Sequence, residues 1–259
     1  PFSVDACFDH TGHGPVPGIK DDNDKWNTTG HRHRIIEVDA SALSLFSRLY
    51  DTEGTPSLQA RLPALHSGQL VDVLRKFATQ KIRLGDFESA YYSTEMWHET
   101  NAVKDGTIKR ETRFPSSSKE WVLSGPHFYV GTPLYKSPRR ICTANLHYDC
   151  LDLTELTDEY LPRTNYVPVC NESEYYKRTP KVPWGENISV ANCFRLFSRQ
   201  NLSQSGERTL ISCIMPPNCA HIHTVNSVSF KEDRKLLMFT GFCLSLGFDF
   251  FMKTTGKDG

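Results

Sequence analysis

The spacing of hydrophobic residues along the chain changes near residue 85. Before this point, apolar residues recur at helical intervals after Asp39 and again through residues 68–80. After it, short apolar runs of extended type are separated by Pro and Gly. The pattern predicts an α+β fold, with a mixed helical and loop segment over residues 1–85 and a mainly antiparallel or mixed sheet with packed helices over residues 86–259.

The first segment predicts few regular elements before its helices. Residues 1–34 are rich in Gly, Asp, Asn and His, which indicates irregular loops. Residues 34–39, RIIEVD, predict a strand. We expect Asp39 or Ser41 to cap the helix that follows, because a side-chain oxygen there accepts a hydrogen bond from an open N–H group of the first turn.

The second segment predicts strands joined by turns. Its most distinct part is residues 194–217, FRLFSRQNLSQSGERTLISCIMPP, which has the pattern of a strand, a polar turn and a second strand. Residues 152–161 predict one short helix. Residues 233–253 are apolar nearly all round, which predicts a buried C-terminal helix with Asp233 as its cap.

Overall charge does not point to a nucleic-acid-binding protein. The chain holds 30 Lys and Arg against 30 Asp and Glu, with 38% apolar and 23% charged residues. Such a globular protein has no global positive field, so a local patch must bind any anionic partner. No stretch reaches about 18 apolar residues and no leader opens the chain, so we expect no membrane partner and a cytoplasmic location. Because the chain begins at Pro1, we expect it to be a piece of a longer protein.

The cysteines and histidines predict neither disulfides nor a metal site. The 8 cysteines are dispersed without a CxxC pair, several of them in apolar runs, so we expect reduced thiols. Histidines pair in HTGH (10–13), HRH (31–33) and HIH (221–223), but no carboxylate or cysteine stands at a recognisable ligand interval. The sequence contains no GxSxG, Walker or HExxH motif and no convincing nuclease set of two carboxylates and a lysine. We therefore predict no catalytic residue in this chain.

The first strand of residues 194–217 carries two arginines. Side chains alternate along a strand, so Arg195 and Arg199 are expected to share one face while Phe194 and Leu196 face the core. Two parallel guanidinium groups on an open face would suit contact with a nucleic-acid strand. The alternative is a solvated face on which the arginines form ordinary salt bridges with Glu207 or Glu186.

The polar turn after this strand adds hydrogen-bonding side chains. It contains Gln200, Gln204 and Arg208. Arg and Gln are the side chains that pair bidentately with guanine and adenine edges, so these residues are candidates for reading bases.

Two further clusters are basic. LYKSPRR, residues 134–140, carries Lys136, Arg139 and Arg140, and YYKRTPK, residues 175–181, carries Lys177 and Arg178 beside two tyrosines. Cations interleaved with aromatic rings suit phosphate contact and base stacking. An ordinary surface loop is an equal alternative for the second cluster.

Several stretches within residues 86–259 together resemble a known protein family. They include YYSTEMWHETNAVKDGTIKR, WVLSGPHFYVGTPLYKSPR, YLPRTNYVPVC, the arginine-bearing strand with ERTLISCIMPP, and LSLGFDFFMK. In this order they resemble the region that follows the methyltransferase domain in large bacterial adenine-specific DNA methyltransferases of the type IIG restriction-modification class and related phage-defence systems. The most specific pattern is R-x-x-x-R…RT-x-I-x-x-x-PP, followed by S-x-x-F-D at residues 245–249.

The resemblance implies a target recognition domain that docks on double-stranded DNA and reads its sequence. The parent protein would bind S-adenosylmethionine in an adjacent methyltransferase domain, of which residues 1–85 would be the tail. This chain has no Gly-rich cofactor loop and no Asn/Asp-Pro-Pro-Tyr/Phe tetrad, since MPPN at residues 215–218 lacks the flanking groups. We therefore expect no cofactor and no methyl transfer in this chain alone. The main alternative is a protein-interaction or scaffolding domain of a phage-defence complex; a Mg²⁺-dependent nuclease is a third.

Overall fold

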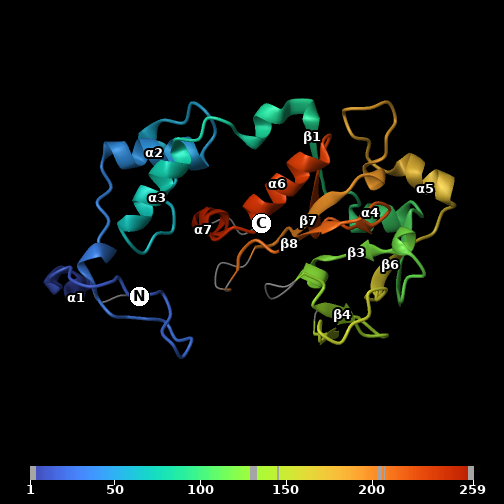
Figure 1. Cartoon of the computed structure of the whole chain (residues 1–259), viewed down its shortest axis with the longest axis horizontal. Helices are drawn as coiled ribbons and strands as arrows, with labels where there is room; N and C mark the ends of the chain where they lie inside the picture. The colour runs from blue at the N-terminus through green and yellow to red at the C-terminus, as the bar shows by residue number, and fades with distance from the viewer. Residues whose placement is uncertain (1–3, 129–132, 145, 203–205, 207, 256–259) are drawn as a thin grey trace. The chain divides into compact units, whose positions relative to one another are not determined.

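The computed structural model describes residues 4–128, 133–144, 146–202, 206 and 208–255. The chain divides into two compact units (Figure 1): Pro1–Leu84 with Lys253–Gly256, and Gly85–Met252 with Lys257–Gly259. Helix and strand are both present in quantity, at 34% and 19% of the chain, so the fold is α+β as the hydrophobic pattern predicts.

The first unit consists of short helices joined by irregular chain. Its α-helices are α1 (Val4–Asp9), α2 (Ala40–Tyr50) and α3 (Gln69–Ala78), with short 3₁₀ turns η1 (Arg32–Arg34) and η2 (Ser57–Gln59). Asp39 caps α2 as expected, because its carboxylate accepts a 2.8 Å hydrogen bond from the N–H of Ala42. Phe46 of α2 and Leu74 of α3 are buried and form the core of this unit.

Two expectations for the first unit are wrong. Residues 35–39 form no strand, and Glu37 and Val38 are exposed. An isolated β-like run needs a partner strand to satisfy its backbone groups, and none lies beside it in the described part of this unit. The expected loops of residues 1–34 include α1, whose Cys7 is buried.

The second unit contains two four-stranded sheets and a two-stranded ladder (Figure 1). The first sheet has the order β1-β10-β7-β8 and is antiparallel throughout. The second has the order β2-β6-β3-β9, with one parallel pair, β3 and β9. The strands are β1 (Tyr91–Thr94), β2 (Ile108–Arg113), β3 (Val122–Leu123), β4 (Lys136–Pro138), β5 (Tyr148–Cys150), β6 (Thr164–Pro168), β7 (Arg195–Arg199), β8 (Ser212–Met215), β9 (Ala220–His221) and β10 (Val225–Phe230).

The predicted strand, turn and strand of residues 194–217 is confirmed as the antiparallel pair β7 and β8. Strand β7 lies between β10 and β8, so both its edges are hydrogen-bonded. Three of its successive side chains, Arg195, Leu196 and Phe197, are buried. Because side chains alternate, this means that both faces of the strand are covered.

The helices of the second unit differ from those predicted. They are α4 (Glu99–Lys104), α5 (Glu172–Arg178), α6 (Asp233–Cys243) and α7 (Leu246–Thr254, whose last two residues belong to the first unit), with 3₁₀ turns η3 (Leu84–Ala90), η4 (Ser118–Glu120), η5 (Gly125–Phe128) and η6 (Val190–Asn192). Residues 152–161 form turns instead of a helix. The helix in this part of the chain is α5, and Asn171 caps it by accepting a 2.9 Å hydrogen bond from the N–H of Glu174.

The predicted single buried C-terminal helix is instead two helices with an open face. Glu232, not Asp233, occupies the cap position of α6. The first helix ends at Cys243 and α7 begins at Leu246. On α6, Leu237 and Met238 are 63% and 66% exposed while Leu236 is buried. Helix α6 therefore packs against the first sheet with one face only.

Candidate functional site

Arg195 lies in the core, which corrects the prediction that it faces DNA. Its side chain is 0% exposed, and the neighbouring Phe194, predicted to face the core, is 46% exposed. The predicted exposure of the Arg195 face was wrong because β7 is a central strand. Packing against both faces of such a strand, and not the polarity of one residue, decides which side chains are buried.

The guanidinium of Arg195 is held by uncharged groups. Nη2 donates a hydrogen bond to the carbonyl oxygen of Cys219, Nη1 lies 3.5 Å from Sδ of Met96, and the group stacks 4.7 Å from the ring centroid of Phe197. Nε has no hydrogen-bond partner in the described part of the chain. Burial lowers the pKa of Arg195 to about 10, so the group stays charged at neutral pH.

The other predicted base-reading residues are only partly open. Gln200 donates a 3.2 Å hydrogen bond to Oε1 of Glu95. Arg208 donates to the carbonyl oxygen of Leu244 at 3.0 Å and lies 3.6 Å from the carboxylate of Asp249. Arg199 is half-buried at the end of β7, and Gln204 lies outside the described residues.

The basic cluster of residues 134–140 forms part of the β4–β5 hairpin. Arg139 is exposed and forms a 2.7 Å ion pair with Asp149 of the facing strand. Lys136 is half-buried, and Arg140 is exposed directly after β4. Since surface pairs of this kind contribute little, Arg139 remains available to exchange its partner for a phosphate.

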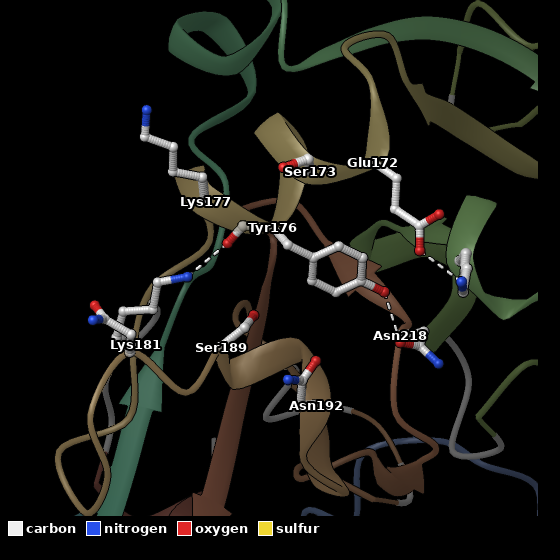
Figure 2. Close-up of a pocket in the computed structure, with 10 residues that line it drawn as sticks. Glu172, Ser173, Tyr176, Lys177, Lys181, Ser189, Asn192 and Asn218 are labelled. Carbon is white, nitrogen blue, oxygen red and sulfur yellow. Dashed lines mark hydrogen bonds and ion pairs between the residues drawn. The ribbon is translucent and has the colours of Figure 1, made fainter.

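The cluster of residues 175–181 belongs to a polar pocket of about 470 Å³, here called the α5 pocket (Figure 2). Helix α5 supplies one wall, and η6 with the turn after β8 supplies the other. Its lining side chains are lysines, amides, hydroxyls and one carboxylate: Lys119, Glu172, Ser173, Tyr176, Lys177, Lys181, Asn187, Ser189, Asn192 and Asn218.

Lysine charge exceeds acidic charge in the α5 pocket. Lys119 forms a 2.6 Å ion pair with Glu172. Lys181 donates to the carbonyl oxygen of Tyr176 at 2.6 Å and has no acidic partner among the residues that the structure describes. Lys177, 80% exposed, stands at the rim with its ammonium pointing outward (Figure 2), 3.9 Å from Glu174. Arg178 lies on the same helix but is engaged by Glu174 at 2.8 Å.

Two asparagines of the α5 pocket occupy strained backbone positions. Asn187 and Asn218 have φ of 56° and 71°, a left-handed region that Asn tolerates better than most residues. The hydroxyl of Tyr176 donates a 2.6 Å hydrogen bond to Oδ1 of Asn218. This bond fixes the Asn218 side chain at the wall of the pocket.

The charge of the buried Arg195 has an electrostatic effect on the α5 pocket. Arg195 holds the carbonyl group of Cys219, the residue directly after Asn218. Burial raises the pKa of Tyr176, while the charges of Lys119 and Arg195 oppose this shift. The positive potential in the pocket therefore comes both from lysines at its surface and from an arginine beneath it.

This arrangement suits an oxyanion, because ammonium groups and amide N–H donors surround an open polar hollow. The sequence pointed to Lys177 but not to Lys119, Asn192 or Asn218, which are distant in the chain. All 8 cysteines are free thiols in the structure. Among the described residues, no group of three His, Cys, Asp or Glu side chains is placed to hold a metal ion.

Comparisons with protein-family models, with curated proteins and with solved structures find no match to this chain. Within its described residues, no single helix is long and apolar enough to cross a membrane; α6 and α7 meet that test only as a pair bent by 69°.

Proposed function

We propose that this chain is a DNA-binding target recognition module, part of a bacterial adenine-N6 DNA methyltransferase of the restriction-modification type. The observation that carries the proposal is the α5 pocket, which Lys119, Lys177 and Lys181 line on a protein whose formal net charge is zero. Phosphate contact supplies most of the affinity of DNA-binding proteins and requires such a local basic surface. The sequence resemblance supports the same function.

In this proposal the α5 pocket binds a backbone phosphate of double-stranded DNA. Lys177 and Lys181 neutralise the phosphate, and the amide of Asn192 donates hydrogen bonds to its oxygens. The β4–β5 hairpin, with Lys136, Arg139 and Arg140, supplies a second backbone contact. S-adenosylmethionine binds elsewhere in the parent protein, which is cytoplasmic.

Residues at the β7–β8 turn read the DNA bases in this proposal. Arg199, Gln200, Gln204 and Arg208 retain this role in the proposal, and Arg195 does not, because it is buried. Gln200 and Arg208 must exchange their present acceptors for base edges on binding. Such side-chain rearrangement is common at interfaces.

The proposal is tested by titrating a fluorescent random duplex with the chain at several salt concentrations. Two phosphate contacts predict a fall in affinity of about twelvefold between 50 and 200 mM salt, from a slope of about −0.9 per contact. Affinity that does not change with salt, or no binding at 50 mM salt, would contradict the proposal. Competition with unlabelled duplex establishes that the label is not the ligand.

A protein-interaction module is the second candidate, and one observation favours it. Leu237, Met238 and Phe242 on α6 are 63%, 66% and 45% exposed, and apolar surface of this kind is typical of protein contacts. Binding to a partner subunit without any shift of duplex DNA would select this function over the first.

A further inference from the structure

Three imidazole rings meet in the first unit, which carries none of the proposed DNA-contacting residues. The ring of His10 lies 4.2 Å from that of His31, which lies 5.4 Å from that of His33. His31 is 2% exposed. The contact joins the end of α1 to η1, since His10 directly follows α1 and His31 caps η1.

Two of these rings accept hydrogen bonds from the backbone. Nδ1 of His10 accepts from the N–H of Gly12 at 2.9 Å, and Nδ1 of His31 accepts from the N–H of His33 at 3.1 Å. A ring nitrogen that accepts must be unprotonated, so both bonds need a neutral imidazole. Nε2 of His31 is buried and has no hydrogen-bond partner among the described residues, so no acceptor there compensates for a charged ring.

Close backbone packing accompanies the ring contact. Gly30 lies so near Ala6 of α1 that an added Cβ would be 2.5 Å from the Ala6 carbonyl carbon. Arg32 donates a 3.2 Å hydrogen bond to the carbonyl oxygen of Phe8 and stacks 5.8 Å from its ring. Helix α1, only six residues long, is therefore held in place by residues 30–33 and not by its own stability.

Further histidines and two arginines lie near the rings. Burial lowers the pKa of His10, and the neighbouring His31, His13 and His33 lower it further. In η1, Arg32 donates to the carbonyl oxygen of Phe8 and Arg34 donates to that of Pro17, while α1 carries the carboxylates of Asp5 and Asp9. Because the histidines lie close together, imidazoles that are protonated at the same time would repel one another.

We infer that His10 and His31 form an acid-sensitive clasp, which holds α1 against residues 30–33 when both rings are neutral and releases it when they are protonated. In the released chain His10 takes up a proton near pH 6.5, above its lowered pKa in the folded chain. A group whose folded pKa is lowered contributes stability above its unfolded pKa and loses it as pH falls below that value. Closure is therefore complete above about pH 7 and weakens below about pH 6.5.

Hydrogen exchange of the full chain at pH 7.5 and pH 5.5, corrected for intrinsic rates, tests the clasp. We expect residues 4–12 and 31–34 to lose protection by about tenfold for each proton taken up, while α2 keeps its protection. The variant His10→Asn with His31→Asn is the decisive comparison. Asn Oδ1 accepts from the N–H two residues later, as each Nδ1 does, but cannot be protonated.

The double Asn variant should keep the protection of residues 4–12 at pH 7.5 and show no loss at pH 5.5. His98→Gln, at an exposed histidine of the second unit, serves as the control and should behave as the wild-type chain does. Equal loss in the wild-type chain and the double Asn variant, or no loss in the wild-type chain, would overturn the inference. If the double variant were unprotected already at pH 7.5, the single variant His10→Asn would decide: a pH-dependence equal to that of the wild-type chain would also overturn it.

Discussion

The hydroxyl of Tyr176 donates a 2.6 Å hydrogen bond to Oδ1 of Asn218, joining α5 to the turn after β8. The two residues are 42 positions apart in the chain. The bond connects the two walls of the α5 pocket (Figure 2). The proposed phosphate site thus depends on a tertiary contact.

Tyr176→Phe should lower the free energy of unfolding by about 1 kcal/mol, because one part-buried hydrogen bond is lost. The variant Asn218→Gly removes the acceptor and keeps the left-handed backbone, whose φ is 71°. In that background Tyr176→Phe should cost almost nothing. Urea denaturation of the four proteins measures this coupling, and additive losses would show that the bond does not form.

Arg195→Ala should lower the free energy of unfolding by about 3 kcal/mol, since it leaves a cavity in a packed core. Arg195→Met fills most of that space and removes a buried charge, so its cost should be below about 1 kcal/mol. Denaturation midpoints of both variants provide the measurement. An unchanged midpoint for Arg195→Ala would instead place the side chain in solvent.

Sequence patterns predicted the strand that bears Arg195 but not its environment. The alternation of polar and apolar residues identifies one exposed and one buried face only when a strand has one covered side. Strand β7 is covered on both, and Arg195 is accommodated by the Cys219 carbonyl group and the Phe197 ring. Neither partner is detectable from the local sequence around Arg195.

The dependence on tertiary contacts also explains which helices the sequence predicted and which it did not. Asp39 followed by helical spacing was sufficient to predict α2, because a cap and an apolar stripe are local signals. Helix α5 spans only seven residues, and its two acids in the first turn resemble an ordinary polar loop. Its stability comes from the burial of Tyr175 against the core cluster of Trp97 and Ile222, a tertiary effect.

Gly30→Ala should detach α1, because the new Cβ would lie 2.5 Å from the backbone of Ala6. Faster hydrogen exchange in residues 4–9 at pH 7.5 is the expected result. Gly85→Ala is the matched control, since a Cβ there meets nothing within 4 Å. Equal protection of residues 4–9 in the two variants would contradict the packing of α1 on residues 30–33.

Glu120 should make stability depend on pH below 4.5. Hydrogen bonds from Arg113 and Ser116 hold its pKa at about 2, against 4.5 for the free group. Its contribution is complete above pH 4.5 and is lost as pH falls toward 2, because the unfolded chain binds the proton first. Glu120→Gln should therefore be less stable than the wild-type chain at pH 7 and equal to it near pH 2.

The control for this prediction is Glu155→Gln, an exposed carboxylate that contacts no cation in the described part of the chain. Urea denaturation across this pH range should show no difference between that variant and the wild-type chain. A Glu120→Gln deficit that is the same at every pH would mean that the loss comes from packing and not from charge.

The most direct test of the α5 pocket is the affinity of Lys177→Ala with Lys181→Ala for a random DNA duplex at low salt. The charge-matched control is Lys25→Ala with Lys76→Ala, two exposed lysines of the first unit. Loss of the phosphate contact of the α5 pocket predicts a fall in affinity of about tenfold and a salt slope that is smaller by about 0.9, while the control keeps the wild-type values. Equal affinity and equal slope in the two double variants would contradict the account.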